Sequence, residues 1–259
     1  MSDPRGKLKL VAVSYLNTKP LLAGLRAAGM DQELEIIEAH PAHCASMIRT
    51  GAADIALMPV ASIPNIPQAQ IISNYCIGAN GPVSSVALFS QVPLEEVQEV
   101  MLDYQSRTSA ALCRLLLEKH WKLPVQFKDT RAGFINEIKG NTAGLVIGDR
   151  SFGLKEKAGY AYDLSQAWHD YTGLPFVFAC WVSRVPLSPA FIDRFDAAMA
   201  KGLAMRRQIA DKLQQNYPDQ NVWKYFTERI DYLLDERKRQ ALERFYEEIG
   251  IHKPIGVSA

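Results

Sequence analysis

Four clusters of polar residues interrupt the apolar segments of this sequence, each where a strand is expected to end or a helix to begin. They are Tyr15 with Asn17, Ser84 with Ser85, the run Ser106, Arg107, Thr108 and Ser109, and Gly148 with Asp149. Hydroxyl and amide groups, which do not titrate near neutral pH, outnumber carboxyl groups in this set. The clusters therefore predict a site that binds an anion and hydroxyl groups and contains few titratable side chains.

The first cluster lies in a turn between an apolar run, residues 8–13, and a helical pattern that ends near Gly29. A strand, a polar turn and a helix are how an α/β sheet presents a ligand site. Thr18 is a candidate helix cap. We expect Tyr15 and Asn17 to leave the core and face a cleft. The alternative is an ordinary strand-to-helix turn with a polar cap.

The second cluster places two hydroxyl groups within an apolar run, residues 83–90, that is predicted to be a strand. Hydroxyl groups are rare in a fully buried strand, so Ser84 and Ser85 are candidates for substrate contacts. The alternative is a detail of an edge strand.

The third cluster begins a helix predicted over residues 106–120. Ser106 can cap this helix, and the free backbone N–H groups of its first turn can hold a carboxylate. Arg107 could add a two-pronged contact to the same anion, and Thr108 and Ser109 add hydroxyl groups. The alternative is a helix cap with a solvated arginine.

The fourth cluster follows an apolar strand predicted over residues 143–147. A cap of the next helix is the favoured interpretation of Asp149, and a ligand contact is the other. His169 stands in a polar, loop-like stretch, where a structural or exposed role is favoured over catalysis. No nucleophile stands beside a base at a known spacing, and neither a phosphate loop nor a metal-binding pattern occurs. No cofactor is therefore predicted.

The overall composition of the chain shows no marked excess of positive or negative charge. The 259 residues include 29 basic and 28 acidic side chains, for a net charge of +1. Nothing in this balance indicates a nucleic-acid surface, so anion binding must be local. The cysteines are far apart, without metal-ligand spacing, and lie in apolar surroundings, which favours buried free thiols in a reducing compartment: Cys44, Cys76, Cys113 and Cys180.

Neither a secretory signal nor a membrane span is predicted. Residues 1–9 are short, polar and charged, without the apolar core of a signal peptide. No run approaches the roughly 20 apolar residues that a membrane helix needs. We therefore expect a cytoplasmic protein with no membrane partner, and no pattern sets its oligomeric state.

Strand and helix patterns alternate twice along the chain and then give way to helices alone. Strands are predicted at residues 8–13, 34–39, 54–58, 70–78, 83–90, 100–103, 125–128 and 143–147, with an extended run at 174–183. Helices are predicted after Pro20 and at residues 41–50, 106–120 and 132–139, and residues 189–249 read as almost wholly helical. Alternation of this kind predicts an α/β fold with parallel sheets.

Two successive α/β blocks suggest two lobes with a cleft between them. We expect residues 1–88 to begin the first lobe, 89–180 to form the second, and 181–259 to return to the first. The passages near 83–90 and 177–183 are the expected crossovers. This organisation resembles the type II periplasmic-binding-protein architecture, a fold that hosts receptors, regulators and enzymes and so does not decide function.

Five phrases of the sequence together resemble the chorismate dehydratases of the futalosine route to menaquinone. They are VSYLNTKPL, GPVSSVAL, LDYQSRTSAALCRLLL, AGLVIGD and YDLSQAWHDYTGLPFVFACW, in the same order between residues 10 and 181. The resemblance implies a two-lobed lyase that removes water from chorismate to give 3-[(1-carboxyvinyl)oxy]benzoate, without a cofactor. By the same resemblance, Asn17 and Ser85 match active-site positions, and the start of the helix at 106–109 matches a carboxylate-binding position.

The chemistry of the residues fits this implication. An asparagine amide does not titrate near neutral pH, so we expect Asn17 to hold the substrate or its leaving hydroxyl and Ser85 to relay or donate a proton. The base is then, as a hypothesis, the enolpyruvyl carboxylate of the substrate. One alternative is 1,4-dihydroxy-6-naphthoate synthase of the same pathway. Its resemblance implies a histidine where this chain has Gly148 and Asp149. The other is a solute-binding or sensor protein without chemistry.

Overall fold

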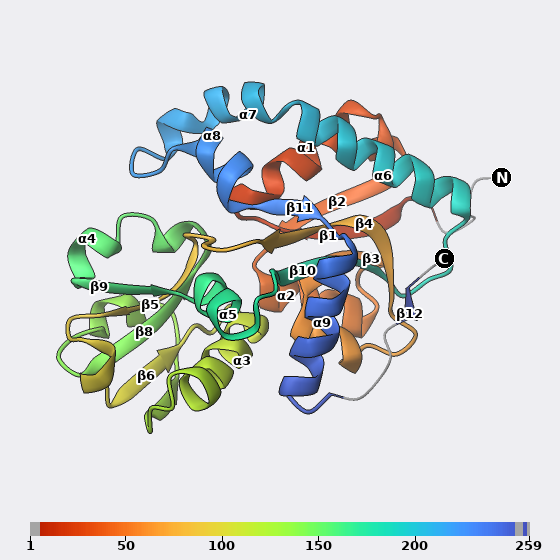
Figure 1. Ribbon diagram of the computed structural model, residues 1–259. Helices are drawn as coiled ribbons and strands as arrows, with labels where there is room; N and C mark the ends of the chain where they lie inside the picture. Colours follow the sequence, from red (N-terminus) through yellow and green to blue (C-terminus); the bar gives the residue numbers. More distant parts are fainter. Residues whose placement is uncertain (1–5, 252–255, 258–259) are drawn as a thin grey trace.

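Two β-sheets form the two lobes of the molecule. The computed structural model describes residues 6–251 and 256–257. One sheet is built from seven strands and the other from five, and each is flanked by helices (Figure 1). The expected two-lobed α/β organisation is confirmed.

The first sheet takes strands from both ends of the chain, in the order β11-β4-β10-β3-β1-β2, with β12 also paired to β4. These strands are β1 (Leu8–Val13), β2 (Leu34–Ala39), β3 (Ile55–Pro59), β4 (Gln70–Ala79), β10 (Phe176–Ser183), β11 (Asp231–Leu233) and β12 (Gly256–Val257). β1 lies parallel to β2 and β3, whereas β10 is antiparallel to both β3 and β4. All eight residues of β10 are buried, as befits a continuous apolar run in the middle of a sheet.

Helices cover both faces of this sheet. In Figure 1, α1 (Lys19–Ala27) and α6 (Pro189–Ala204) lie above it, and α2 (Pro41–Thr50) and α9 (Glu236–Glu248) lie below. The short helices α7 (Arg206–Leu213) and α8 (Val222–Lys224), followed by a π-helical turn at Tyr225–Arg229, complete the C-terminal segment. Helix α6 of this segment packs against α1, and the assignment of residues 181–259 to the first lobe stays a prediction.

The second sheet is formed by consecutive segments, in the order β7-β6-β8-β5-β9. Its strands are β5 (Val86–Ser90), β6 (Glu99–Leu102), β7 (Gln126–Asp129), β8 (Thr142–Ile147) and β9 (Tyr160–Asp163). Its helices are α3 (Arg107–Leu115), with a π-helical continuation at Leu116–His120, α4 (Lys155–Ala158) and α5 (Leu164–Thr172). The chain passes between the sheets at residues 80–85 and 173–175. The exact lobe boundaries stay predictions.

Several local predictions were wrong. Residues 132–139 form only a 3-10 turn at Phe134–Glu137, because the glycines that flank it adopt positive φ angles. The strand predicted from residue 83 begins at Val86, since Ser84 has a φ of +64° and breaks the extended run. β9 and α5 were missed, and the C-terminal segment contains strand β11 besides its helices.

Two further expectations concern cysteines and membranes. Each of the four cysteines is buried and unpaired, as predicted, and burial raises the pKa of the Cys44, Cys113 and Cys180 thiols to about 12. Among the helices within residues 6–251, none has the length and apolar character that crossing a bilayer requires.

A glycine pair lets α1 and α6 cross with their backbones in contact. A Cβ atom added to Gly24 would overlap the carbonyl oxygen of Ala198, and one added to Gly202 would overlap that of Pro20. The obstructing atoms are backbone, so no side-chain rotation can relieve the overlap. The two helices belong to opposite ends of the chain, and this crossing joins them.

We predict that Gly202→Ala destabilises the protein. Alanine is the better helix former by about 1 kcal/mol, but forcing apart two packed helices costs about 1–3 kcal/mol, and the second effect wins. Urea unfolding should show a lower free energy of unfolding. Ala200→Lys, at an exposed position of the same helix, should change it by less than about 0.5 kcal/mol. A stabilised Gly202→Ala variant would contradict the tight crossing.

Candidate functional site

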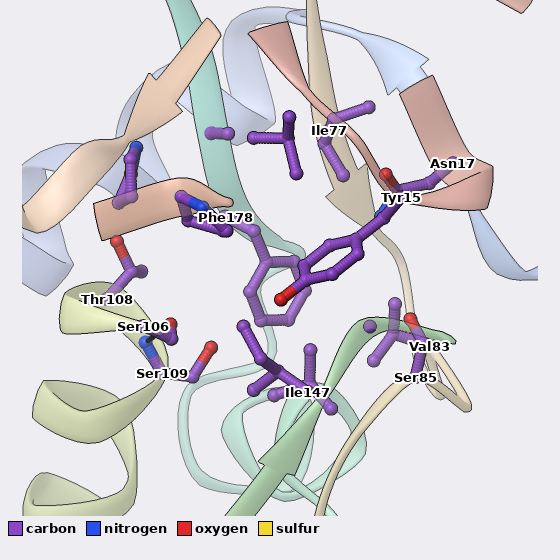
Figure 2. A pocket seen from close by; sticks show the side chains of 16 residues that line it. Tyr15, Asn17, Ile77, Val83, Ser85, Ser106, Thr108, Ser109, Ile147 and Phe178 are labelled. Carbon is purple, nitrogen blue, oxygen red and sulfur yellow. Dashed lines mark hydrogen bonds between the residues drawn. The ribbon is translucent and has the colours of Figure 1, made fainter. Parts of the chain in front are cut away.

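A pocket lies between the lobes, where strands from both sheets end. Residues at the ends of β1, β3 and β8 line it, together with the start of α3, which follows β6. Its walls enclose about 520 Å³ of empty space, including the part that is open to solvent. In Figure 2 the start of α3 lies on one side and Ser85 on the other, with the rings of Tyr15 and Phe178 between them. The carboxyl ends of strands are where α/β folds bind their ligands.

The structure brings most of the predicted site residues together. Seven of them line this one pocket: Tyr15, Asn17, Ser85, Ser106, Thr108, Ser109 and Gly148. The other three, Ser84, Arg107 and Asp149, are not part of its lining. Ser84 and Arg107 are exposed, so their roles in substrate binding stay predictions.

Asn17 belongs to a 3-10 turn, Leu16–Thr18, that joins β1 to α1. Its side chain is nearly buried, and its Oδ1 accepts a hydrogen bond of 3.1 Å from the Thr18 hydroxyl. The Tyr232 hydroxyl donates to its backbone carbonyl at 2.9 Å. Thr18 makes no side-chain cap to α1, so the capping role predicted for it was wrong; its hydroxyl orients the Asn17 amide.

Ser85 lies just before β5 and is 1% exposed. Its backbone carbonyl accepts a hydrogen bond from the N–H of Gly148 at 2.8 Å, which ties it to the end of β8. Its Oγ accepts a second bond of 2.8 Å from the hydroxyl of Tyr225. Tyr225 was not predicted, because an aromatic residue in a helical pattern is the ordinary sign of core packing.

The start of α3 presents three hydroxyl groups to the pocket. Ser106 caps the helix, as predicted, because its Oγ accepts a hydrogen bond of 3.0 Å from the N–H of Ser109. The Thr108 hydroxyl accepts a bond of 3.1 Å from the N–H of Ala61, in the first lobe. The first turn of a helix favours an anion through its dipole and its free N–H groups, so this edge of the pocket suits a carboxylate.

Tyr15 spans the gap between the lobes. Its ring lies 2.6 Å from the position that a Cβ atom on Gly148 would occupy, so only glycine fits there. Its hydroxyl donates to Oε1 of Gln105, and the positive charge of Arg150 lies nearby and lowers the pKa of the phenol. Burial raises the pKa of Tyr15, so the phenol stays neutral.

A partly buried ion pair lies behind Tyr15 and its partner Gln105, whose N–H donates to Asp103. The Nη2 of Arg150 donates to both carboxylate oxygens of Asp103, at 2.9 and 2.6 Å. The Asp103 side chain is completely buried, and its Oδ2 also accepts a bond from the N–H of Ile147. Both residues follow apolar strands, the same signal that identified Asp149, so sequence reasoning could have found them.

Asp149 joins three segments of the chain. Its carboxylate accepts hydrogen bonds of 2.9 and 3.1 Å from the N–H of Leu16 and one of 3.0 Å from the Tyr217 hydroxyl. Burial raises the pKa of Asp149, while these two donors lower it. The helix cap favoured for Asp149 was wrong, because its partners lie across the cleft.

His169 is remote from these contacts. It lies in α5, a helix, so its predicted loop-like setting was wrong, and it does not line the pocket. The Asp163 cap and Gly173, in left-handed conformation at the other end, are helix signals that the sequence contained.

The lining of the pocket is uncharged. None of the described residues that form it is an aspartate, glutamate, lysine, arginine or histidine. The same part of the chain contains no group of three or more potential metal-ligating side chains. This arrangement offers hydroxyl, amide and backbone hydrogen bonds, and it can bind and orient a polar molecule.

Comparisons with known proteins agree on the fold and on a metabolic role. The model of a family described as menaquinone biosynthesis matches residues 8–250. The chorismate dehydratase of Thermus thermophilus is 28% identical over 273 residues, which cover 92% of this chain and 93% of that protein.

Solved structures match over nearly the whole chain. A protein of Archaeoglobus fulgidus has a TM-score of 0.73 at 13% identity, covering 94% of this chain and 97% of that one. The alkanesulfonate-binding protein of Xanthomonas axonopodis pv. citri, bound to MOPS, has a TM-score of 0.67 at 10% identity and full coverage of both chains. A Candida albicans protein described as having the generic periplasmic-binding-protein fold scores 0.63 at 11% identity, covering 96% and 92%. The expected periplasmic-binding-protein fold is thereby confirmed.

We predict that Asp149→Ala loosens the contact between the lobes. The substitution leaves the Leu16 N–H and the Tyr217 hydroxyl without this acceptor, at a cost of about 1–3 kcal/mol. The free energy of unfolding should fall, and small-angle X-ray scattering should show a larger radius of gyration. Asp170→Ala, which removes an exposed carboxylate bonded to Gln166 in its own helix, should change neither. Unchanged scattering and stability in Asp149→Ala would contradict the bridging role.

Proposed function

The chain belongs to the menaquinone biosynthesis family, and from this premise we propose that it is a chorismate dehydratase. It removes water from chorismate and releases 3-[(1-carboxyvinyl)oxy]benzoate. The proposal is supported by the relative of that activity, which is similar over nearly the full length of both chains. The observation that carries it is the uncharged pocket between the lobes, which has Asn17, Ser85 and the start of α3 in its walls.

The pocket suits the functional groups of chorismate. The substrate carries two carboxylates and a ring hydroxyl. The first turn of α3, with its hydroxyl groups and its helix dipole, binds one carboxylate. Asn17 and Ser85 bind the ring hydroxyl. The apolar side chains of Val83, Ile147 and Phe178 pack against the ring.

The reaction requires little acid–base catalysis by side chains of the protein. Loss of the hydroxyl and the neighbouring ring proton makes the ring aromatic, so the driving force lies in the substrate. The enzyme has to orient the substrate and stabilise the charge that develops on the leaving oxygen. Because no side chain in the lining can act as an ordinary general base, the enolpyruvyl carboxylate of the substrate takes the ring proton.

We predict that the purified protein consumes chorismate without added metal, nucleotide or flavin. The product is aromatic, so its absorbance and its mass identify it. Turnover should persist after dialysis against a chelator. Chorismate binding without turnover, in protein shown to be folded, would instead indicate a solute-binding or sensor protein.

Substitutions at Asn17 and Ser85 should act mainly on turnover. We expect Asn17→Ala and Ser85→Ala each to lower kcat at least 100-fold, about 2.7 kcal/mol in activation free energy, with a smaller change in KM. Asn17→Asp should also weaken binding, because it brings a negative charge toward a dianionic substrate. Steady-state kinetics with chorismate measures both parameters.

His169→Ala is the matched control for these variants. His169 lies in α5 outside the pocket, so its loss should leave turnover near that of the unmodified protein. Loss of activity in His169→Ala, together with near-normal activity in the Asn17 and Ser85 variants, would identify a histidine base. The substrate-assisted mechanism would then be wrong.

A further inference from the structure

We infer that Tyr225 is a positioning residue that makes Ser85 a hydrogen-bond donor to the substrate; the inference rests on the proposed dehydratase function. Tyr225 begins the π-helical turn after α8 and is 1% exposed. Its hydroxyl lies 2.8 Å from Ser85 Oγ, and the Asn17 side chain lies near enough to lower the pKa of the phenol. One buried hydroxyl is thus bonded to Ser85 and lies near Asn17, the two side chains on which the elimination depends.

The direction of these hydrogen bonds follows from the chemistry of the groups. The Thr18 hydroxyl donates to Asn17 Oδ1, which leaves the amide N–H groups of Asn17 as its donors toward the pocket. A phenol is a stronger acid than an alkyl hydroxyl, so Tyr225 donates its proton to Ser85 Oγ. Since that bond occupies a lone pair of Ser85, the Ser85 O–H is left to point into the pocket.

Tyr225 acts through Ser85 and does not itself reach the substrate. Among the residues that the structure describes, Tyr225 is not one of those that line the pocket. Burial raises the pKa of Tyr225, and the nearby Asp149 carboxylate raises it further, so the phenol is a poor proton donor to the reaction. Its contribution is to hold the Ser85 proton toward the leaving hydroxyl before the reaction begins.

The position of the ring is itself fixed from the second lobe. Phe152, just after the segment that contains Asp149, packs edge-to-face on Tyr225 with ring centroids 5.3 Å apart. Tyr225 belongs to the C-terminal segment and contacts the second lobe through Phe152, so the position of its hydroxyl depends on the two lobes being together.

Tyr225→Phe is the direct test, because it removes the hydroxyl and keeps the ring. With chorismate as substrate, we expect kcat to fall about tenfold, the worth of one hydrogen bond, with KM nearly unchanged. In the double variant Ser85→Ala/Tyr225→Phe, kcat should equal that of Ser85→Ala, since Tyr225 has nothing left to orient. Tyr246→Phe, which removes another buried hydroxyl, bonded to the Val60 carbonyl outside the pocket, should keep normal kinetics.

A second measurement does not depend on the phenylalanine variant folding. Difluorotyrosine at position 225 keeps the shape and the hydroxyl but ionises at lower pH, after which it can no longer donate. The alkaline limb of the kcat profile should then move to lower pH.

The outcomes separate the two proposals. Failure of the unmodified protein to turn over chorismate would remove the proposed function and this inference with it. An active protein with an unchanged kcat in Tyr225→Phe, an additive loss in the double variant, or an unmoved pH profile would overturn the role of Tyr225 alone.

Discussion

The contact between Asp149 and the backbone of Leu16 is the interaction on which the site depends. It fixes the turn after β1 against the end of β8, and these two segments supply Asn17 and Gly148 to the same pocket. Ionised carboxylates are costly to bury, so this one is satisfied by a backbone N–H and a tyrosine hydroxyl. Removing either partner would leave a buried polar group without a hydrogen bond, which costs free energy. This penalty, as well as the attraction between the partners, keeps the lobes together.

The cost of burying charge also explains why charged side chains lie outside the pocket lining. The ion pair of Asp103 and Arg150, whose carboxylate is completely buried, is neutralised within itself and lies beside Tyr15. A pocket lined by hydroxyl and amide groups presents dipoles whose directions are fixed before a ligand enters. Such a lining suits an anionic ligand, because no carboxylate repels it, and the ligand can contribute its own titratable groups.

Features set by neighbouring residues could be predicted from the sequence, whereas contacts between distant segments could not. The buried strands of both sheets were predictable, because apolar runs such as that of β10 bury both faces and leave little choice of structure. The polar groups at strand ends were predictable as a site for the same reason, since they have no place in the core. The partners of Asp149 were not, because Leu16 lies 133 residues away and donates through its backbone, which carries no residue identity.

Tyr225 and Arg107 show in two opposite ways what residue type alone leaves open. Tyr225 has the spacing of a core aromatic residue and is indeed buried, but its hydroxyl contact with Ser85 depends on how two distant segments pack. Arg107 has the chemistry of an anion contact, yet it stands at an exposed position of the first turn of α3, where only the neighbouring residues face the pocket. Residue type predicts the chemistry of a side chain, and its position around the helix decides whether it lines the pocket.

The place of β10 in the first sheet bears on how the chain is made. β10 lies between β3 and β4, so the first four strands cannot form a continuous sheet until a strand about 100 residues later has been synthesised. The five strands of the second sheet, by contrast, follow one another without interruption. We therefore expect the second lobe to fold first on the ribosome. The N-terminal strands cannot complete their sheet until β10 has been synthesised, and until then their apolar surfaces need protection from aggregation.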